Sequence, residues 1–135
     1  MKSSNLTIKE KFMSNQTAIL LGATGEVGGH ILQELLNSPA YQTIYVIGRV
    51  SINHLLEYHK VTKVIIDFDK PMIDLDILIG SDIFCAIGTG EPQNFERVNY
   101  GYVYSFARLC DGLVNSFNLV SAMGPVVRHT IISAD

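Results

Sequence analysis

A chain of 135 residues is long enough to form one domain with a buried core. Its net charge is -3, and its ten Lys and Arg are scattered, which argues against a nucleic acid or an anionic membrane as partner. No run of about 18 apolar residues is present, so we expect neither a membrane span nor a signal peptide.

The chain opens with a polar stretch, residues 1–16, which we expect to be a flexible extension. The apolar run at residues 17–21 then predicts a buried strand. Residues 27–36 carry apolar side chains at helical spacing, and Pro39 is expected to prevent the helix from continuing. Four more strands are predicted at residues 43–47, 63–66, 82–87 and 117–121, a long helix at residues 94–112, and short, weaker helices at residues 51–59 and 72–79.

Strands and helices therefore alternate, and the strands are continuous apolar runs, which is typical of a parallel sheet covered on both faces. We predict a Rossmann-type, doubly wound α/β fold with about five strands in the order 3-2-1-4-5, incomplete at its C-terminal side. The expected domain covers residues 17–124, and residues 125–135 are expected to form an irregular tail.

A glycine-rich turn stands between the first strand and the first helix, which is the context that a dinucleotide-binding motif requires. Gly22 permits the turn, Gly25 lets the backbone approach a pyrophosphate, and Gly28 lets the helix pack closely on the strand. Phosphates would then meet free N–H groups at the helix N-terminus. The alternative is a tight turn without a ligand. The predicted binding residues of the turn are Gly22, Thr24, Gly25, Glu26, Val27 and Gly28.

Arg49 follows the second strand, where NAD-binding domains usually have an acidic residue for the adenosine ribose. A carboxylate would repel a 2′-phosphate, whereas a guanidinium can pair with it. The residue therefore favours NADP(H) over NAD(H). The alternative is a solvated surface arginine.

Two further segments follow strands at the edge where ligands bind in such sheets. Asp67 and Phe68 follow the third strand, where a side chain can reach the adenine and an aromatic ring can cover it; Asp67 could instead cap the next turn. Residues 88–90, Gly-Thr-Gly, follow the fourth strand and leave room for a cofactor, and a plain loop is the alternative there.

These motifs together resemble the atypical short-chain dehydrogenase/reductases, in particular the Tat-interacting-protein-30-like, NAD(P)H-binding oxidoreductases. The resemblance implies that Arg49 contacts the 2′-phosphate of NADP, that Asp67 contacts the adenine, and that Ala86, Ile87 and Gly88 line the adenosine side. The motifs that carry it lie at residues 22–28, 46–49, 67–68, 85–89, 98–99 and 118–124.

The sequence departs from that family in its expected catalytic pair. The family has a Tyr-x-x-x-Lys pair on the helix after the fifth strand, and residues 125–135 contain neither Tyr nor Lys. Tyr104 and Arg108 have the spacing, but they precede the fifth strand, and arginine does not readily share a proton. Ser121 is a weak substitute for the family's active-site hydroxyl.

Three hypotheses about function follow. The chain is an NADP(H)-binding oxidoreductase-type domain without independent catalysis, or a nucleotide-sensing or protein-interaction module. Least favoured is a chain whose partner supplies the missing acid/base. A homo-oligomer or a protein partner could cover the edge of the fifth strand.

Cys85 and Cys110 lack CxxC spacing, which predicts reduced core thiols in a cytoplasmic protein. The four histidines lack the spacing of metal ligands, so we expect no metal site.

Overall fold

The computed structural model describes residues 16–86 and 101–120. They contain a parallel sheet of five strands in the order β3-β2-β1-β4-β5, which confirms the predicted fold class and strand order. The strands are β1 (Gln16–Leu21), β2 (Tyr41–Gly48), β3 (Val61–Ile65), β4 (Asp82–Cys85) and β5 (Ser116–Leu119).

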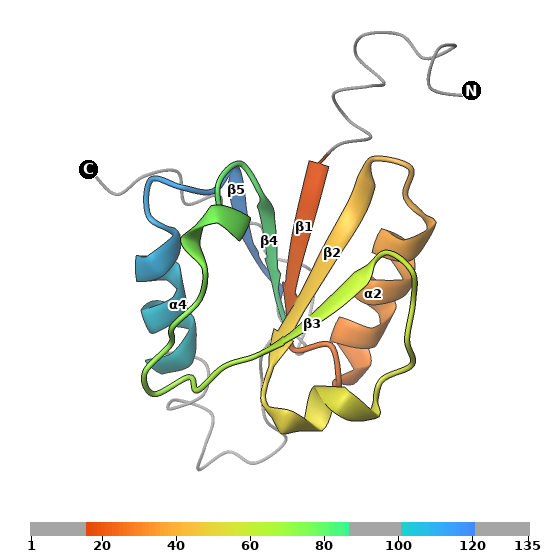
Figure 1. Ribbon diagram of the computed structural model, residues 1–135, viewed down its shortest axis with the longest axis horizontal. Helices are drawn as coiled ribbons and strands as arrows, with labels where there is room; N and C mark the ends of the chain where they lie inside the picture. The colour runs from red at the N-terminus through yellow and green to blue at the C-terminus, as the bar shows by residue number, and fades with distance from the viewer. Residues whose placement is uncertain (1–15, 87–100, 121–135) are drawn as a thin grey trace, which may run out of the picture.

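Two α-helices cover opposite faces of the sheet, α2 (Glu26–Asn37) and α4 (Val103–Cys110) (Figure 1). Each face has its own core, because successive side chains of a strand point to opposite sides. Alternate residues of β1 show this division: Ala18 and Leu20 pack with α2, whereas Ile19 and Leu21 belong to the cluster beneath α4. Residues 18–21 of β1 are all fully buried, as expected for a central parallel strand.

Helix α2 extends one residue beyond the predicted range 27–36 at each end and buries Leu32 and Leu35 against the sheet. No basic residue of its own stands in its last turn. Instead, the Lys60 ammonium donates to the carbonyl oxygens of Leu36 and Ser38, at 3.1 and 2.9 Å. A cation from a distant loop thus satisfies carbonyls that the end of the helix leaves unpaired.

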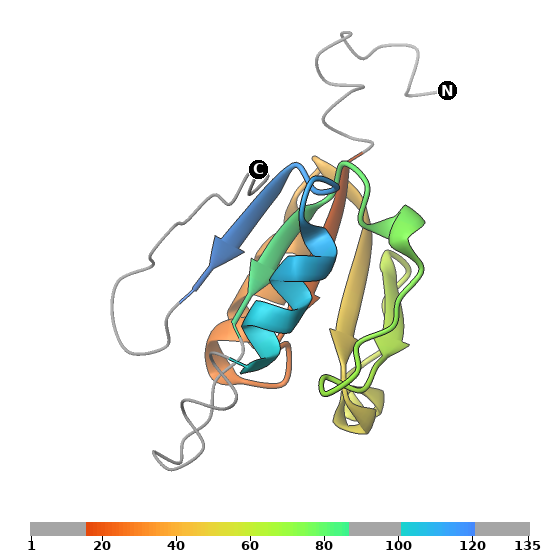
Figure 2. The same cartoon turned by 90° about the vertical axis from the view of Figure 1, so that its left-hand side faces the viewer.

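Helix α4 corresponds to the C-terminal part of the helix predicted at residues 94–112. Phe106 and Cys110 are buried, and Tyr102, Leu109 and Leu113 pack around the same cluster. Figure 2 shows α4 lying over one face of the sheet. The N-terminal part of the predicted helix lies outside the described residues.

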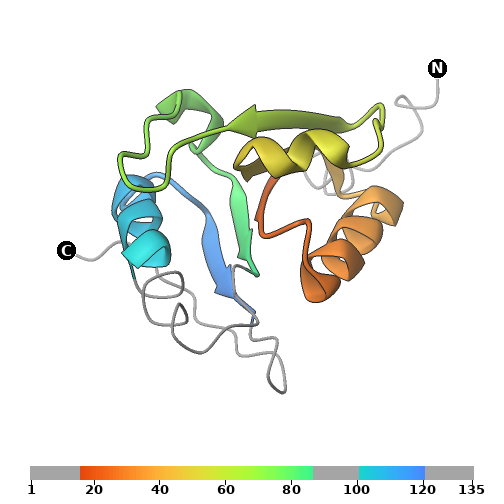
Figure 3. The same cartoon turned by 90° about the horizontal axis from the view of Figure 1, so that it is seen from below.

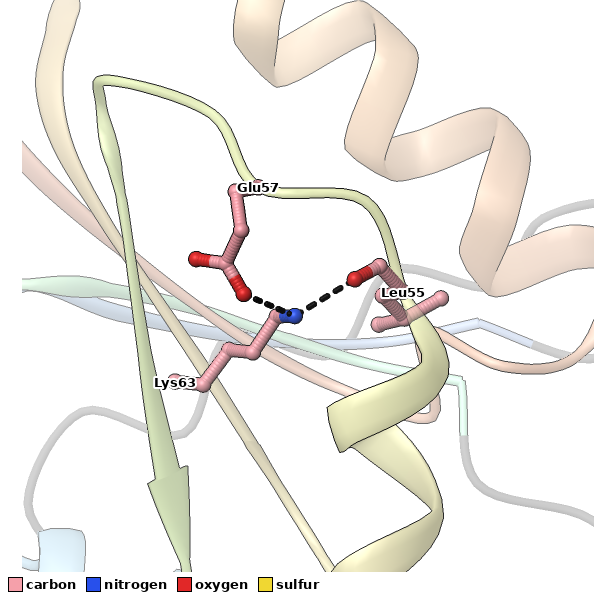
Figure 4. A network of polar contacts seen from close by, with 3 residues as sticks. All are labelled: Leu55, Glu57 and Lys63. Atoms are coloured by element: carbon pink, nitrogen blue, oxygen red, sulfur yellow. Dashed lines mark hydrogen bonds and ion pairs between the residues drawn. The ribbon is translucent and has the colours of Figure 1, made fainter.

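The two weaker predicted helices are short 3-10 segments, η2 (Val50–His54) and η3 (Leu75–Ile77). Neither stretch has the apolar stripe that would stabilise a longer helix on the sheet. The chain after η2 is held to β3 by Lys63, whose ammonium contacts the Leu55 carbonyl oxygen at 2.5 Å and the Glu57 carboxylate at 2.7 Å (Figure 4).

A buried carboxylate joins the amino ends of three strands. Asp82 accepts hydrogen bonds from the Tyr41 hydroxyl at 2.8 Å and from the Asn115 amide and Ser116 hydroxyl, both at 2.7 Å. Burial of the phenol, followed by its hydrogen bond to Asp82, raises the pKa of Tyr41 well above its ordinary value. This network lies at the sheet edge opposite to the one where ligands bind in such folds.

Both cysteines are buried in the core and form no disulfide, as predicted from their apolar surroundings. Burial, with a smaller contribution from Cys85, raises the pKa of the Cys110 thiol from 9.0 to about 12. Above pH 9 the unfolded chain ionises this thiol while the folded chain keeps it neutral. The free energy of unfolding therefore decreases progressively as the pH rises from 9 toward 12.

This loss can be measured by urea unfolding followed by circular dichroism at pH 8 and pH 10.5. We expect Cys110→Ala to lose less stability between these two pH values than the wild type, by up to about 1.4 kcal/mol per pH unit. Equal losses in the two proteins would contradict the assignment of the raised pKa to Cys110.

Candidate functional site

The predicted binding residues that the structure describes lie at the carboxyl edge of the sheet, the lower edge in Figure 1. The glycine turn follows β1, Arg49 follows β2, Asp67 follows β3 and Ala86 follows β4. Backbone hydrogen bonds hold these strand ends together, from Ala86 N–H to Leu21 O and from Ile66 N–H to Gly48 O, both 2.9 Å. Ile87, Gly88 and Ser121 lie outside the described residues.

The glycine turn has a conformation that side chains would disturb at two positions. Gly22 has a φ of 89°, which favours glycine. At Gly28 a Cβ atom would lie 1.8 Å from the Gly22 carbonyl oxygen. No side chain can occupy that space without moving α2 away from the turn. Gly28 therefore allows the close helix packing predicted from the sequence.

Gly25 differs from Gly22 and Gly28 because the fold does not require a glycine at this position. It caps α2 with φ -81° and ψ 171°, an extended conformation open to other residues. A Cβ atom there would meet only the Gly22 carbonyl oxygen, at an ordinary contact distance of 3.6 Å. Packing within the described chain thus gives no reason for a glycine at this position.

The start of α2 is an exposed, uncapped helix terminus. Gly25 has no side chain that could accept from the first N–H groups, and no side-chain cap is formed. Thr24, Gly25 and Glu26 are exposed, and Val27 is half-buried. The N–H groups and the positive end of the helix dipole suit a phosphate, and the Thr24 hydroxyl is available beside them. Glu26 would present its backbone N–H rather than its carboxylate.

Arg49 is exposed directly after β2, next to β1 in the sheet. The turn that carries it is well defined, since the Ile52 N–H donates to the Arg49 carbonyl oxygen at 3.0 Å. Gly48 precedes it, and a Cβ atom at Gly48 would lie 2.5 Å from the Ile52 side chain. The close packing of η2 on the strand end thus positions the arginine backbone at this edge.

Asp67 and Phe68 have structural contacts of their own. One carboxylate oxygen of Asp67 accepts from the Asp69 N–H at 2.9 Å, so the residue caps the following turn, the alternative raised by the sequence. Phe68 is buried and stacks on Tyr102, with ring centroids 5.3 Å apart. An adenine contact by this ring would require it to leave that stack, so burial disfavours the predicted role.

Tyr104 and Arg108 form a surface pair on α4. The Arg108 guanidinium lies 5.8 Å from the centre of the Tyr104 ring, which is largely exposed.

Within residues 16–86 and 101–120, no three His, Cys, Asp or Glu side chains are grouped so as to hold a metal ion. The same residues contain no helix long and apolar enough to cross a membrane.

Known proteins with a similar sequence include the following two relatives. Protein HTATIP2 of Rattus norvegicus is 33% identical over 131 residues, which cover 91% of this chain and 54% of that protein. Protein FMP52, mitochondrial, of Candida glabrata is 39% identical over 49 residues, 36% of this chain and 21% of that protein. This chain thus spans about half of HTATIP2 and a smaller part of FMP52. No model of a protein family matches the sequence.

Solved structures share the fold. A mutated uronate dehydrogenase superposes with a TM-score of 0.58 at 16% identity, covering 87% of this chain and 48% of that one. Pen from Bacillus thuringiensis gives a TM-score of 0.53 at 13% identity, covering 73% and 35%. The similarity to HTATIP2 over most of this chain and the fold shared with a dehydrogenase agree with the resemblance predicted from the sequence.

Proposed function

We propose that this chain, a homologue of HTATIP2 with the fold of the short-chain dehydrogenases, binds NADP(H) on the turn between β1 and α2. The observation that carries the proposal is the pair Gly25 and Gly28. Gly28 is needed to pack the helix, whereas Gly25 has no packing role and leaves the helix N–H groups open to a diphosphate. A uronate dehydrogenase is among the solved structures that share the fold, which supports a nicotinamide dinucleotide as the proposed ligand.

Cofactor binding can be tested by thermal unfolding of the whole chain. A ligand that binds only the folded state adds about 2.7 kcal/mol at a concentration one hundred times its Kd, so NADPH is expected to raise the Tm. A titration to millimolar NADPH that leaves the Tm unchanged would remove the proposal.

The preference for NADP(H) over NAD(H) rests on Arg49, which is exposed directly after β2, the strand next to β1. Arg49→Ala is expected to weaken NADPH binding about tenfold and to leave NADH binding nearly unchanged, because only NADPH has the 2′-phosphate. Calorimetric titration with both cofactors measures this. Arg108→Ala is a matched control, since it removes the same charge from α4. Equal NADPH affinities for the wild type and Arg49→Ala would contradict the phosphate contact.

We further propose that the isolated 135-residue chain does not turn over a substrate. Residues 121–135 contain neither the Tyr nor the Lys that the family places after the fifth strand. An assay of NADPH oxidation across a panel of carbonyl compounds is expected to show no activity. Turnover by the chain alone would show that another group serves as the general acid. A cytoplasmic location stays a prediction.

A second candidate function is a protein-interaction module. The observation that favours it is the position of β5, which forms an edge of the sheet among the described residues. An edge strand presents unpaired N–H and C=O groups to another chain. Self-association or binding of a protein partner is then expected, and sedimentation as a monomer at high concentration would contradict the homo-oligomer.

A further inference from the structure

An apolar groove of about 390 Å³ lies between α2 and the neighbouring strands β4 and β5. Its apolar lining comes from Val27, Ile31 and Leu35 on the helix and from Phe84 and Val120 on the strand side. Among the described residues, α2 contacts β1 and β2, whereas α4 lies on the other face of the sheet (Figure 3). The groove thus lies on the side of the sheet that carries α2, at β4 and β5, where no described element covers the strands.

The polar residues around the groove leave its floor apolar. The Asn118 side chain also lines it, but its amide donates to the Ile83 carbonyl oxygen at 3.0 Å and to the Ser116 hydroxyl at 3.1 Å. His30 and Glu34 line it from α2 and are both exposed, so a negative charge and an imidazole stand at its border. A suitable occupant is an apolar peptide segment with a basic residue.

We propose that residues 121–135, here called the tail, fold back from Val120 and cover this groove in the same molecule. Val120 lines the groove, and the tail follows it directly in the chain. The tail has the required chemistry, because it contains two apolar pairs, residues 126–127 and 131–132, and Arg128, whose charge is opposite to that of Glu34. Gly124 and Pro125 form a dipeptide typical of a chain reversal.

The tail is long enough to reach across the groove. The helical side of the groove runs from Val27 to Leu35, which is about 12 Å at the rise of an α-helix. Seven residues after Pro125, extended at about 3.3 Å each, span about 23 Å. A covalently tethered segment also has an effective concentration in the millimolar range, which favours the tail over a second copy of the chain.

The test compares two double variants of the 135-residue chain by amide hydrogen exchange. Ile131→Asp with Ile132→Asp removes the apolar pair, whereas Thr130→Asp with Ser133→Asp adds the same charge without removing apolar surface. The first pair is expected to speed exchange in α2 and β5 about tenfold, and the control pair much less. Equal exchange in the two double variants and the wild type would overturn the proposal.

A charge reversal tests the position of the tail without removing apolar groups. Glu34→Lys and Arg128→Glu are each expected to speed exchange in α2, and their combination is expected to restore protection. Additive effects of the two substitutions would contradict the pairing. Protection that appears only at high protein concentration, together with sedimentation as a dimer, would show that a second copy fills the groove and would also overturn the proposal.

Discussion

Substituting Gly28 with alanine is expected to destabilise the fold by about 3 kcal/mol or more and to abolish cofactor binding. The added Cβ atom would lie 1.8 Å from the Gly22 carbonyl oxygen and 2.6 Å from its carbonyl carbon. These are backbone atoms of the turn, so they cannot rotate away as a side chain would. Relief requires a shift of α2 against β1, at the upper end of the cost of overpacking. Urea unfolding followed by circular dichroism measures the change.

Gly29→Ala is a matched control for this substitution. Gly29 lies in the same helical turn, but a Cβ atom there would approach only the Ala23 carbonyl oxygen, at 3.9 Å. Alanine is the better helix former by about 0.5–1 kcal/mol, so this variant is expected to be as stable as the wild type or more stable. A similar loss of stability in both variants would contradict the close contact between the helix and the turn.

Gly25→Ser is expected to change stability and cofactor affinity in opposite directions. The extended backbone at Gly25 accepts serine, whose hydroxyl can cap the first N–H groups of α2, so stability is expected to hold or to rise by a few tenths of a kcal/mol. The same side chain would occupy the approach of the pyrophosphate and compete for the N–H groups. NADPH affinity is therefore expected to fall at least about tenfold, a loss of about 1.4 kcal/mol.

The change in stability and the change in affinity can be measured on one protein sample, the first by thermal unfolding and the second by calorimetric titration. A variant that is folded and stable but binds poorly would separate the ligand role of Gly25 from the packing role of Gly28. If Gly25→Ser bound NADPH as tightly as the wild type, the pyrophosphate would have to lie elsewhere.

Most of the fold could be predicted because its strands are continuous apolar runs and because residues that end strands and helices separate them. The run at residues 17–21 became β1 with one added residue, and Pro39 follows the end of α2 closely. The predicted strand at residues 63–66 was less accurate, since β3 begins at Val61 and ends at Ile65. Strand ends depend on pairing with β2, which a single stretch of sequence does not contain.

The site was predicted in part, because backbone positions follow from the strand order whereas side-chain contacts do not. The glycine turn and Arg49 stand at the predicted edge. The burial of Phe68 was missed, although a signal was present: Ile66 is buried, Asp67 is exposed and Phe68 is buried, so the alternation of the strand continues beyond its end.

The groove beside α2 was also missed in the sequence. It follows from the handedness of the crossovers, since β1 connects to β2 on one side of the sheet centre and β4 connects to β5 on the other. Right-handed connections in these two directions put α2 and α4 on opposite faces. One face of β4 and β5 is then left without a described helix, which the predicted strand order already implied.

The most direct measurement is a titration of the isotope-labelled wild type with NADPH, followed by backbone amide nuclear magnetic resonance. The proposed binding mode predicts saturable shifts of the Glu26, Val27 and Gly28 amide signals, and loss of those shifts in Gly25→Ser. Amide signals of these residues that stay in place up to millimolar NADPH, or saturable shifts confined to another part of the chain, would contradict it.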